Sequence, residues 1–311
     1  MSLVESPIQI RSMVSALKPL LSAQAVVREN EPLSKRTTLR VGGPADLYLE
    51  PGSEADLATV LSYCKQHAIP WMMLGRGSNL LVRDGGIRGV VICLGTPAFH
   101  SLRINGAEVF AGGGVRLRSL AFEAKKVLLT GFEFMEGIPG NVGGALRMNA
   151  GAMGSAMFEV LNSVRHMDSE GNINESKVDQ IPVEYRNCPL FKTHIVLSAT
   201  FTGNTGKKDE IEQRMNECSQ KRWKSQPAAP SAGCIFKNPT SIPTGRLVEE
   251  LGLKGTRRGG AVISDVHGNF IVNDGNASAR DILELIDFVK EKARSQRGIE
   301  LHTEVQIVGE D

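Results

Sequence analysis

The most restrictive feature of this sequence is the segment from Gly137 to Gly151 (GIPGNVGGALRMNAG), which holds five glycines and an Ile-Pro step. Glycine adopts positive φ values without steric cost and lets peptide N–H groups come close to a ligand. A second such segment, Gly75 to Val82 (GRGSNLLV), directly follows the apolar run Trp71 to Leu74. The two segments together predict backbone sites for the anionic groups of a dinucleotide, although for either one alone a tight turn between strands is the alternative.

The composition is that of an ordinary soluble enzyme. The chain has 311 residues, of which 41% are hydrophobic and 23% charged, and its net charge is +2, which argues against general affinity for nucleic acids. Its five cysteines and six histidines show no metal-ligand spacing and indicate a reducing compartment without a metal site. No run approaches the roughly 20 apolar residues of a membrane span, and no secretion signal is evident. We therefore expect a cytoplasmic protein with no membrane contact and no obligate protein partner.

Local signals predict an α+β chain. Ser53, followed by Asp56 three residues later, is typical of a helix start, and the Asn105-Gly106 step is typical of a tight hairpin turn. The predicted helices are residues 53–67, 117–129, 209–223, 244–251 and 278–294, and the predicted strands and hairpins are residues 44–51, 71–74, 90–94, 102–111, 160–167, 195–201 and 301–308 with a hairpin around 267–269.

A polar break at residues 203–208 (GNTGKK) predicts a domain boundary. We expect an N-terminal lead and a first subdomain at residues 1–97, a second subdomain at 98–208 and a C-terminal domain at 209–311. Neither glycine segment fits the common nucleotide fingerprints, because the first lacks the third glycine of the dehydrogenase pattern and no Gly-Lys-Ser/Thr sequence occurs. Ser78 and Asn79, beside exposed peptide N–H groups, suit the oxygens of a pyrophosphate.

Several motifs occur in an order that is familiar from one enzyme family. They are TTLRVGGPA at residues 37–45, the two glycine segments, Tyr185-Arg186, AGCIFKNP at residues 232–239, and Glu304-Val305. In this order and over residues 37–309, the chain closely resembles the UDP-N-acetylenolpyruvoylglucosamine reductase (UDP-N-acetylmuramate dehydrogenase) family.

The resemblance implies an FAD-binding fold of the vanillyl-alcohol-oxidase (PCMH) type, built from two subdomains and followed by a C-terminal α/β substrate-binding domain. It implies noncovalent FAD, NADPH as co-substrate, and reduction of UDP-N-acetylglucosamine enolpyruvate to UDP-N-acetylmuramate for peptidoglycan and the cell wall. It also implies that FAD contacts the following residues: Val41, Gly42, Gly43, Gly75, Arg76, Gly77, Ser78, Asn79, Leu80, Gly137, Ile138, Pro139, Gly140, Val142, Gly143, Gly144, Asn149, Ala150 and Gly151.

Three residues carry the implied chemistry. Arg186, at the family's Tyr-Arg position, can grip a substrate carboxylate with two hydrogen bonds, although an isolated Tyr-Arg pair more often forms a surface ion pair. Cys234 stands where many family members have serine and is implied as the proton donor; a thiol with a reference pKa of ~8.5 remains largely protonated at neutral pH. The alternative for Cys234 is a small buried hydrophobe. Glu304 is implied to bind the substrate carboxylate or relay a proton, and sequence alone favours a solvated residue on an edge strand.

The implied substrate contacts are less firmly assigned. Asn238 and Lys237 follow the proton donor directly, and either Arg222 or Lys224 would supply a further cation for the UDP phosphates. Tyr185 either contacts substrate, orients Arg186 or fills the core. We assign no role to Cys188 and expect His267 to be exposed in a hairpin turn rather than catalytic.

Two other functions are considered. A related flavin oxidase would return electrons to oxygen, and such enzymes often attach flavin through a histidine or cysteine, which neither glycine segment contains. A nonenzymatic RNA-binding module would require strong basic character, which the net charge of +2 and the 5% aromatic content do not provide.

Overall fold

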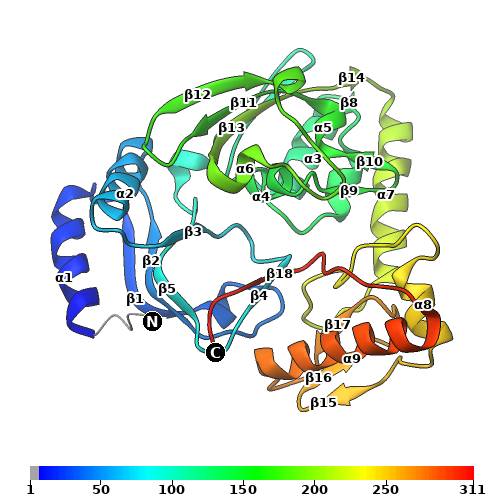
Figure 1. Ribbon diagram of the computed structural model, residues 1–311. Helices are drawn as coiled ribbons and strands as arrows, with labels where there is room; N and C mark the ends of the chain where they lie inside the picture. The colour runs from blue at the N-terminus through cyan, green and yellow to red at the C-terminus, as the bar shows by residue number, and fades with distance from the viewer. Residues whose placement is uncertain (1–6) are drawn as a thin grey trace. The chain divides into compact units, whose positions relative to one another are not determined.

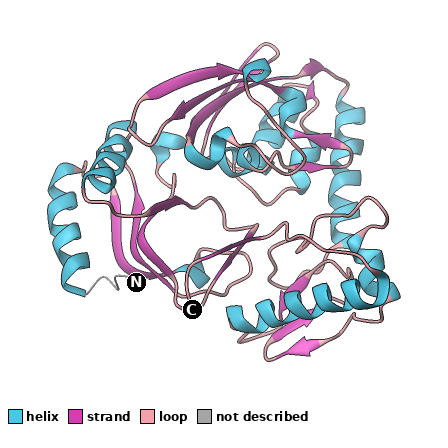
Figure 2. Ribbon diagram, viewed as in Figure 1, coloured by secondary structure: helices cyan, strands magenta, loops and turns pink. Residues whose placement is uncertain are grey.

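The structure of the protein, a computed structural model, describes residues 7–311 and mixes helices and strands throughout (Figure 2). The chain forms two compact units. The first unit contains Asp46–Gly75 and Arg88–Lys221 with residues up to Glu29, and the second contains Asn30–Ala45, Arg76–Ile87 and Arg222–Asp311. The first glycine segment is therefore divided between the two units after Gly75. The three-part division at residues 97 and 208 stays a prediction.

A four-stranded sheet and two helices form the N-terminal region (Figure 1). The second of these helices, α2 (Glu54–Gln66), starts where the sequence predicted. The Ser53 side chain caps it by accepting a hydrogen bond from the Asp56 N–H at 3.0 Å. Leu47, Leu57 and Ile92 belong to the apolar core shared by the sheet and helices. The sheet order is β1-β2-β5-β3, with β1 at Val26–Pro32, β2 at Pro44–Glu50, β3 at Trp71–Met73 and β5 at Ile87–Ile92, and the helices are α1 at Pro7–Leu17 and α2 at Glu54–Gln66.

An antiparallel five-stranded sheet follows in the first unit. The predicted hairpin is confirmed, since Asn105 pairs with Glu108 across a two-residue turn in which Gly106 has a φ of 56°. Helices α4 (Val142–Arg147) and α6 (Leu190–Thr193) pack against the central strand β13 (Figure 1). The sheet order is β12-β11-β13-β7-β6, with β6 at Leu102–Asn105, β7 at Glu108–Gly112, β11 at Leu161–Met167, β12 at Ile173–Lys177 and β13 at Ile195–Thr202.

Shorter elements complete this unit. The helix predicted over residues 117–129 ends earlier, because Leu128 adopts a φ of 58°, and the chain then forms strand β8. Strand β8 pairs with β14, which lies inside the predicted polar break, so this break is partly ordered as a strand. The elements are α3 at Leu117–Lys126, β8 at Leu129–Thr130, α4 at Val142–Arg147, β9 at Gly151–Ala152, β10 at Ser155–Ala156, α5 at Met157–Val160, α6 at Leu190–Thr193, β14 at Asn204–Thr205 and α7 at Lys208–Ser225.

The second unit packs two helices and a small sheet around its own core. Leu247, Ile263 and Ile286 are among its fully buried members. The predicted closing strand is shorter than expected and forms a parallel pair with β4, in which Gln306 lies opposite Leu80. The elements are β4 at Leu80–Val82, α8 at Thr244–Glu250, β15 at Arg257–Arg258, β16 at Ala261–Ile263, β17 at Ile271–Asn273, α9 at Ala279–Arg297 and β18 at Gln306–Val308.

Five single 3₁₀ turns also occur in the described residues, at Lys18–Leu20 (η1), Leu33–Lys35 (η2), Pro97–Phe99 (η3), Glu133–Gly137 (η4) and Val178–Gln180 (η5). Within residues 7–311, no helix has the length and apolar character needed to cross a bilayer.

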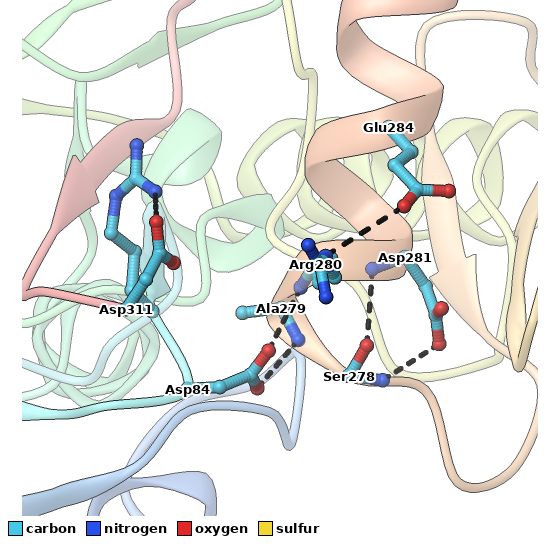
Figure 3. Close-up of polar contacts among 8 residues, drawn as sticks. Asp84, Ser278, Ala279, Arg280, Asp281, Glu284 and Asp311 are labelled. Carbon is cyan, nitrogen blue, oxygen red and sulfur yellow. Dashed lines mark hydrogen bonds and ion pairs between the residues drawn. The ribbon is translucent and has the colours of Figure 1, made fainter.

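Two carboxylates and a hydroxyl accept hydrogen bonds from the backbone N–H groups at the start of α9 (Figure 3). Asp84 accepts hydrogen bonds from the N–H groups of Ala279 at 2.8 Å and Arg280 at 3.0 Å. Ser278 accepts from the Asp281 N–H at 3.1 Å, and the Asp281 side chain accepts from the Ser278 N–H at 2.9 Å. The first N–H groups of the helix are therefore paired, and the negative charges lie at the positive end of the helix dipole.

The change Asp84→Ala is expected to lower the free energy of unfolding by about 1 to 2 kcal/mol, because two helix N–H groups lose their acceptor. Urea denaturation followed by circular dichroism measures this loss. The control is Asp311→Ala, because the Asp311 side chain is 72% exposed in its pair with Arg83 and should contribute less than about 1 kcal/mol. An equal loss in the two variants would contradict the capping role of Asp84.

Candidate functional site

In the second unit, the first glycine segment offers a row of peptide N–H groups. Gly77 is buried with a φ of 60°, and an added Cβ would lie 2.5 Å from the Arg36 carbonyl oxygen, so this position requires glycine. Within the described residues, the N–H groups of Gly77, Ser78 and Asn79 donate to no protein acceptor. Three successive donors of this kind fit the oxygens of a pyrophosphate.

The neighbouring residues Val41, Gly42 and Gly43 have packing reasons for their identity. Val41 is buried in the core of the second unit. A Cβ on Gly42 would lie 2.5 Å from the Val82 Cβ, and a Cβ on Gly43 would lie 2.1 Å from the Asp84 carbonyl oxygen. The Gly43 N–H already donates to Arg83 O at 2.9 Å. Their contact with FAD stays a prediction.

The second glycine segment, in the first unit, contains a short helix that the sequence did not predict. Asn141 caps α4, because its side chain accepts from the Gly144 N–H at 3.1 Å. The N–H groups of Val142 and Gly143 donate to Val115 and Gly113, each at 2.9 Å. These amides are therefore used inside the protein, and any contact with FAD at Val142, Gly143 or Gly144 must involve other atoms.

Gly137 and Gly140 differ from the other glycines of this segment. None of the five glycines has a positive φ, but an added Cβ would meet no atom closer than 4.0 Å at Gly137 or 3.7 Å at Gly140, whereas the nearest atom would lie at 3.3 Å, 2.9 Å and 2.5 Å for the other three. The protein's own packing does not require glycine at these two positions. Space for a missing Cβ is what a ligand lying against the backbone needs. The segment therefore fits a bound cofactor through the surface of Gly137 to Gly140. Gly75, also in the first unit, is explained by packing, since its Cβ would lie 2.9 Å from Asn141 Oδ1.

Arg186 lies in a tight turn that is joined to the second glycine segment. Glu184 and Asn187 exchange backbone hydrogen bonds, and Arg186 between them has a φ of 57°. Its guanidinium donates to the carbonyl oxygens of Asn149 at 3.4 Å and Gly151 at 3.1 Å. Tyr185 is 57% exposed, with its ring centre 4.9 Å from the Arg186 Cζ, so it is not a core aromatic.

Cys234 and Glu304 lie on adjacent backbone segments of the second unit. The Glu304 N–H donates to the Ile235 carbonyl at 2.8 Å, and the Lys237 N–H donates to the His302 carbonyl at 2.9 Å. Asn79 joins this pair, because its side chain donates to the Glu304 carbonyl at 3.1 Å. The structure therefore brings the first glycine segment, the Cys234 segment and the Glu304 segment together.

A pocket of about 260 Å³ opens beside Cys234. His267 lines this pocket and is half-buried, so the expectation of an exposed turn residue was wrong. Its Nδ1 accepts from the Asn269 N–H at 3.1 Å, which assigns the proton of the neutral ring to Nε2. Burial, opposed by a local backbone hydrogen bond and reinforced by nearby Lys254, lowers the pKa of His267. The lining residues are Cys234, Asn238, Pro243, Gly245, Arg246, Glu249, Lys254, Val266, His267, Gly268 and Asn269.

The remaining predicted residues divide into two groups. Asn238 lines the pocket, and its side chain also accepts from the Thr244 N–H at 3.0 Å. Lys237, Arg222 and Lys224 are not among the lining residues, and their contact with the UDP phosphates stays a prediction.

Two further observations concern the cysteines and metal ligands. Cys188 is fully buried, and burial raises the pKa of its thiol, which agrees with assigning it no role. Over residues 7–311, no group of three His, Cys, Asp or Glu side chains could hold a metal ion.

Lys254 belongs to a basic cluster, residues 254–258, that the sequence marks for local contact with a phosphate, whereas the sequence signal for His267 was weak. Lys254 lies two residues after the helix-ending Gly252, and His267 lies in the loop between β16 and β17. Neither position has a spacing that links it to Cys234, because they meet Cys234 only through the packing of the second unit. Asn141, by contrast, precedes Gly144 by three residues, which is the spacing of a helix cap and could have revealed α4.

Comparison with known proteins agrees with this arrangement. Residues 45–176 match the FAD binding domain family, and residues 226–308 match the C-terminal domain of UDP-N-acetylenolpyruvoylglucosamine reductase. The reductase of Bacillus pumilus is 45% identical over 296 residues, covering 94% of this chain and 97% of that protein. The reductase of Bacillus subtilis is 45% identical over 286 residues, covering 91% and 94%.

A solved structure supports the same assignment. The crystal structure of UDP-N-acetylenolpyruvylglucosamine reductase from Thermus caldophilus aligns with a TM-score of 0.79 at 36% identity, covering 91% of this chain and 98% of that one. The α+β fold, with its FAD-binding region and C-terminal domain, is confirmed by these matches. Identity above 40% across almost the full length of its relatives, with the family's motifs gathered in the two units, shows that the chain belongs to the UDP-N-acetylenolpyruvoylglucosamine reductase family of FAD-dependent oxidoreductases.

Proposed function

We propose that this chain reduces UDP-N-acetylglucosamine enolpyruvate to UDP-N-acetylmuramate with electrons from NADPH, and that Cys234 supplies the proton. The observation that carries the proposal is the pocket beside Cys234, which has Asn238, Lys254 and His267 on its walls. The Cys234 thiol can donate a proton, Asn238 supplies an amide, and Lys254 and His267 supply hydrogen-bond donors. This set of groups suits a substrate that carries a diphosphate and accepts a proton.

FAD fits the residues that the family resemblance assigned to it. The N–H groups of Gly77, Ser78 and Asn79 would hold its pyrophosphate, and the surface over Gly137 and Gly140 leaves room for it. The chemistry that bound FAD would supply is transfer of the two electrons of NADPH to the substrate alkene as a hydride.

The chain's own residues then manage charge and protons. Hydride addition to the outer carbon of the enolpyruvyl group leaves negative charge on the inner carbon and its carboxylate. Arg186 would hold this carboxylate with charge-assisted hydrogen bonds. Cys234 would donate its proton to the inner carbon, which completes the lactyl ether and leaves a thiolate that regains a proton from water. Glu304 would either bind the carboxylate while protonated or relay the proton to Cys234.

The UDP diphosphate would lie in the pocket beside Cys234. Lys254 is half-buried there and pairs with Glu249 at 3.0 Å, so its ammonium is held at the pocket wall. The Nε2–H of His267 supplies a second donor, and Asn238 supplies an amide. These residues would anchor the nucleotide while the enolpyruvyl group reacts.

Affinity for UDP-N-acetylglucosamine is expected to rise as the pH falls from 7.5 toward 5.5. The lowered pKa of His267 favours its neutral form in the free protein, and a diphosphate beside Nε2 would raise that pKa, so binding takes up a proton. The affinity therefore rises over the pH range between the pKa of His267 in the free protein and its higher pKa in the complex. Calorimetric titration across this range measures it.

The matched variant for this pH effect is His267→Gln, which keeps a hydrogen-bond donor but does not titrate. It should bind UDP-N-acetylglucosamine with an affinity that is nearly independent of pH. A wild-type affinity with the same flat profile would contradict the assignment of His267 to the diphosphate.

The proposed reaction is tested anaerobically on the FAD-loaded protein. NADPH should bleach the flavin absorbance, and UDP-N-acetylglucosamine enolpyruvate should then restore it in step with formation of UDP-N-acetylmuramate. UDP-N-acetylglucosamine, which lacks the alkene, is the control and should leave the flavin reduced. Failure of the enolpyruvyl nucleotide to restore the absorbance would overturn the proposal.

We further propose that the enzyme works in the cytoplasm, since its substrates are a UDP-sugar and NADPH, and that it needs no protein partner. This agrees with a sequence of near-neutral charge whose five cysteines lie at scattered positions.

A further inference from the structure

Arg186 and Asn149, whose carbonyl accepts a hydrogen bond from the Arg186 guanidinium, both have left-handed backbone. Arg186 has a φ of 57° and Asn149 a φ of 40°. L-residues with side chains are disfavoured in this region, and their surroundings must hold them there. Left-handed conformations of this kind are common at functional sites, and neighbouring residues must stabilise the one at Arg186.

Asn149 contacts the Arg186 turn from two sides. Its backbone carbonyl accepts from Arg186 Nη1 at 3.4 Å, and its side-chain amide donates to the Glu184 carbonyl, at the start of the turn, at 3.4 Å. Its side-chain oxygen accepts from the Phe158 N–H at 3.4 Å. One residue therefore ties both the backbone and the guanidinium of the turn to helix α5.

The segment that carries Asn149 is itself fixed. The Ala150 N–H donates to Ala145 in α4 at 2.8 Å, and the Met157 N–H donates to the Ala150 carbonyl at 3.0 Å. The Arg186 turn, in contrast, is exposed at Val183, Glu184 and Tyr185. The turn thus depends on contacts with the Asn149 segment for its orientation.

We propose that Asn149 is a positioning residue for Arg186, which it holds in the orientation needed to grip the carboxylate of the substrate. This inference rests on the proposed function, in which Arg186 binds that carboxylate. A bidentate contact requires the guanidinium plane to be fixed, and residues that orient a binding group typically change its effectiveness by about 10- to 100-fold. The side chain of Asn149 acts on the turn, and its carbonyl acts on the guanidinium.

The test compares two ligands that differ in the carboxylate. UDP-N-acetylmuramate carries it and UDP-N-acetylglucosamine does not, and both are titrated calorimetrically into the FAD-loaded protein. Asn149→Gly removes the side chain while accepting a φ of 40° without strain. It should weaken binding of UDP-N-acetylmuramate by about tenfold or more and leave binding of UDP-N-acetylglucosamine unchanged.

A double-mutant cycle separates positioning from a general structural role. Arg186→Ala alone should remove the preference for the carboxylate ligand, and adding Asn149→Gly should then cost no further affinity. The control variant is Asn162→Ala, which deletes another 3.4 Å side-chain hydrogen bond, to Thr202, in the same unit. It should leave the affinities for both ligands at their wild-type values.

Several outcomes would overturn the inference. They are an unchanged preference in Asn149→Gly, an equal loss for both ligands, or a loss that adds to that of Arg186→Ala. If Asn149→Gly fails to fold or to retain flavin absorbance, Asn149→Asp decides, since it keeps the acceptor for Phe158 and loses the donor to Glu184. A wild-type protein with no preference for the carboxylate ligand would instead refute the proposed role of Arg186.

Discussion

Replacing Cys234 by alanine is expected to slow reduction of the enolpyruvyl nucleotide by about 10²- to 10⁴-fold, the usual contribution of a positioned general acid. The cause is loss of the proton that the inner carbon must receive. Stopped-flow spectroscopy should show that NADPH still reduces the flavin at the wild-type rate, while reoxidation by the enolpyruvyl nucleotide becomes slow.

Serine provides the matched control at this position. Cys234→Ser keeps a proton-bearing atom of similar size and should retain much more activity than Cys234→Ala, although an alcohol is a weaker acid than a thiol. Full turnover by the alanine variant would remove Cys234 from the mechanism. Glu304, whose N–H donates to the Ile235 carbonyl directly after Cys234, would then be the next candidate for the acid.

Arg186→Ala is expected to lower kcat/KM for the enolpyruvyl nucleotide by about 10²- to 10³-fold, since the developing charge on the substrate carboxylate loses its main electrostatic partner. Steady-state kinetics with varied enolpyruvyl nucleotide measures this change. Alanine also keeps the strained φ of 57° at this position, so its thermal stability should be compared with that of Arg186→Gly.

Two controls separate recognition of the carboxylate from loss of positive charge. Arg186→Lys keeps the charge but loses the planar pair of donors, and it should recover only part of the activity. Arg165→Ala removes another arginine of the first unit, which is paired with Glu54 at 2.7 Å, and should leave kcat/KM unchanged. A similar kcat/KM in Arg186→Ala and wild type would contradict the proposed grip.

The sequence predicted those parts of the fold whose signals are local. The Ser53 cap and the Asn105-Gly106 turn are each set by residues within three or four positions, and the structure confirms both. Pairing of Leu80 with Gln306 was not predicted, because no short-range signal joins residues so far apart in the chain. The glycines of the second segment also concealed helix α4, since glycine has low helix propensity.

In the candidate site, too, the sequence predicted what short motifs mark and not the contacts between distant residues. Motifs identified Arg186, Cys234 and Glu304 as residues of interest, and the structure joins Glu304 and the Cys234 segment through backbone hydrogen bonds. The contribution of His267 to the pocket and the link from Asn149 to Arg186 depend on tertiary packing. A single sequence contains no direct record of such contacts, so these two roles could be assigned only from the structure.

The parallel pairing of β18 with β4 has a consequence for biosynthesis. The Gln306 N–H donates to the Asn79 carbonyl at 3.0 Å, and the Asn79 side chain donates to the Glu304 carbonyl at 3.1 Å, so the amides proposed to hold the pyrophosphate are braced by a strand that is synthesised long after them. This bracing cannot form until residues 306–308 have left the ribosome. Ribosome-stalled chains that end before β18 should therefore remain colourless.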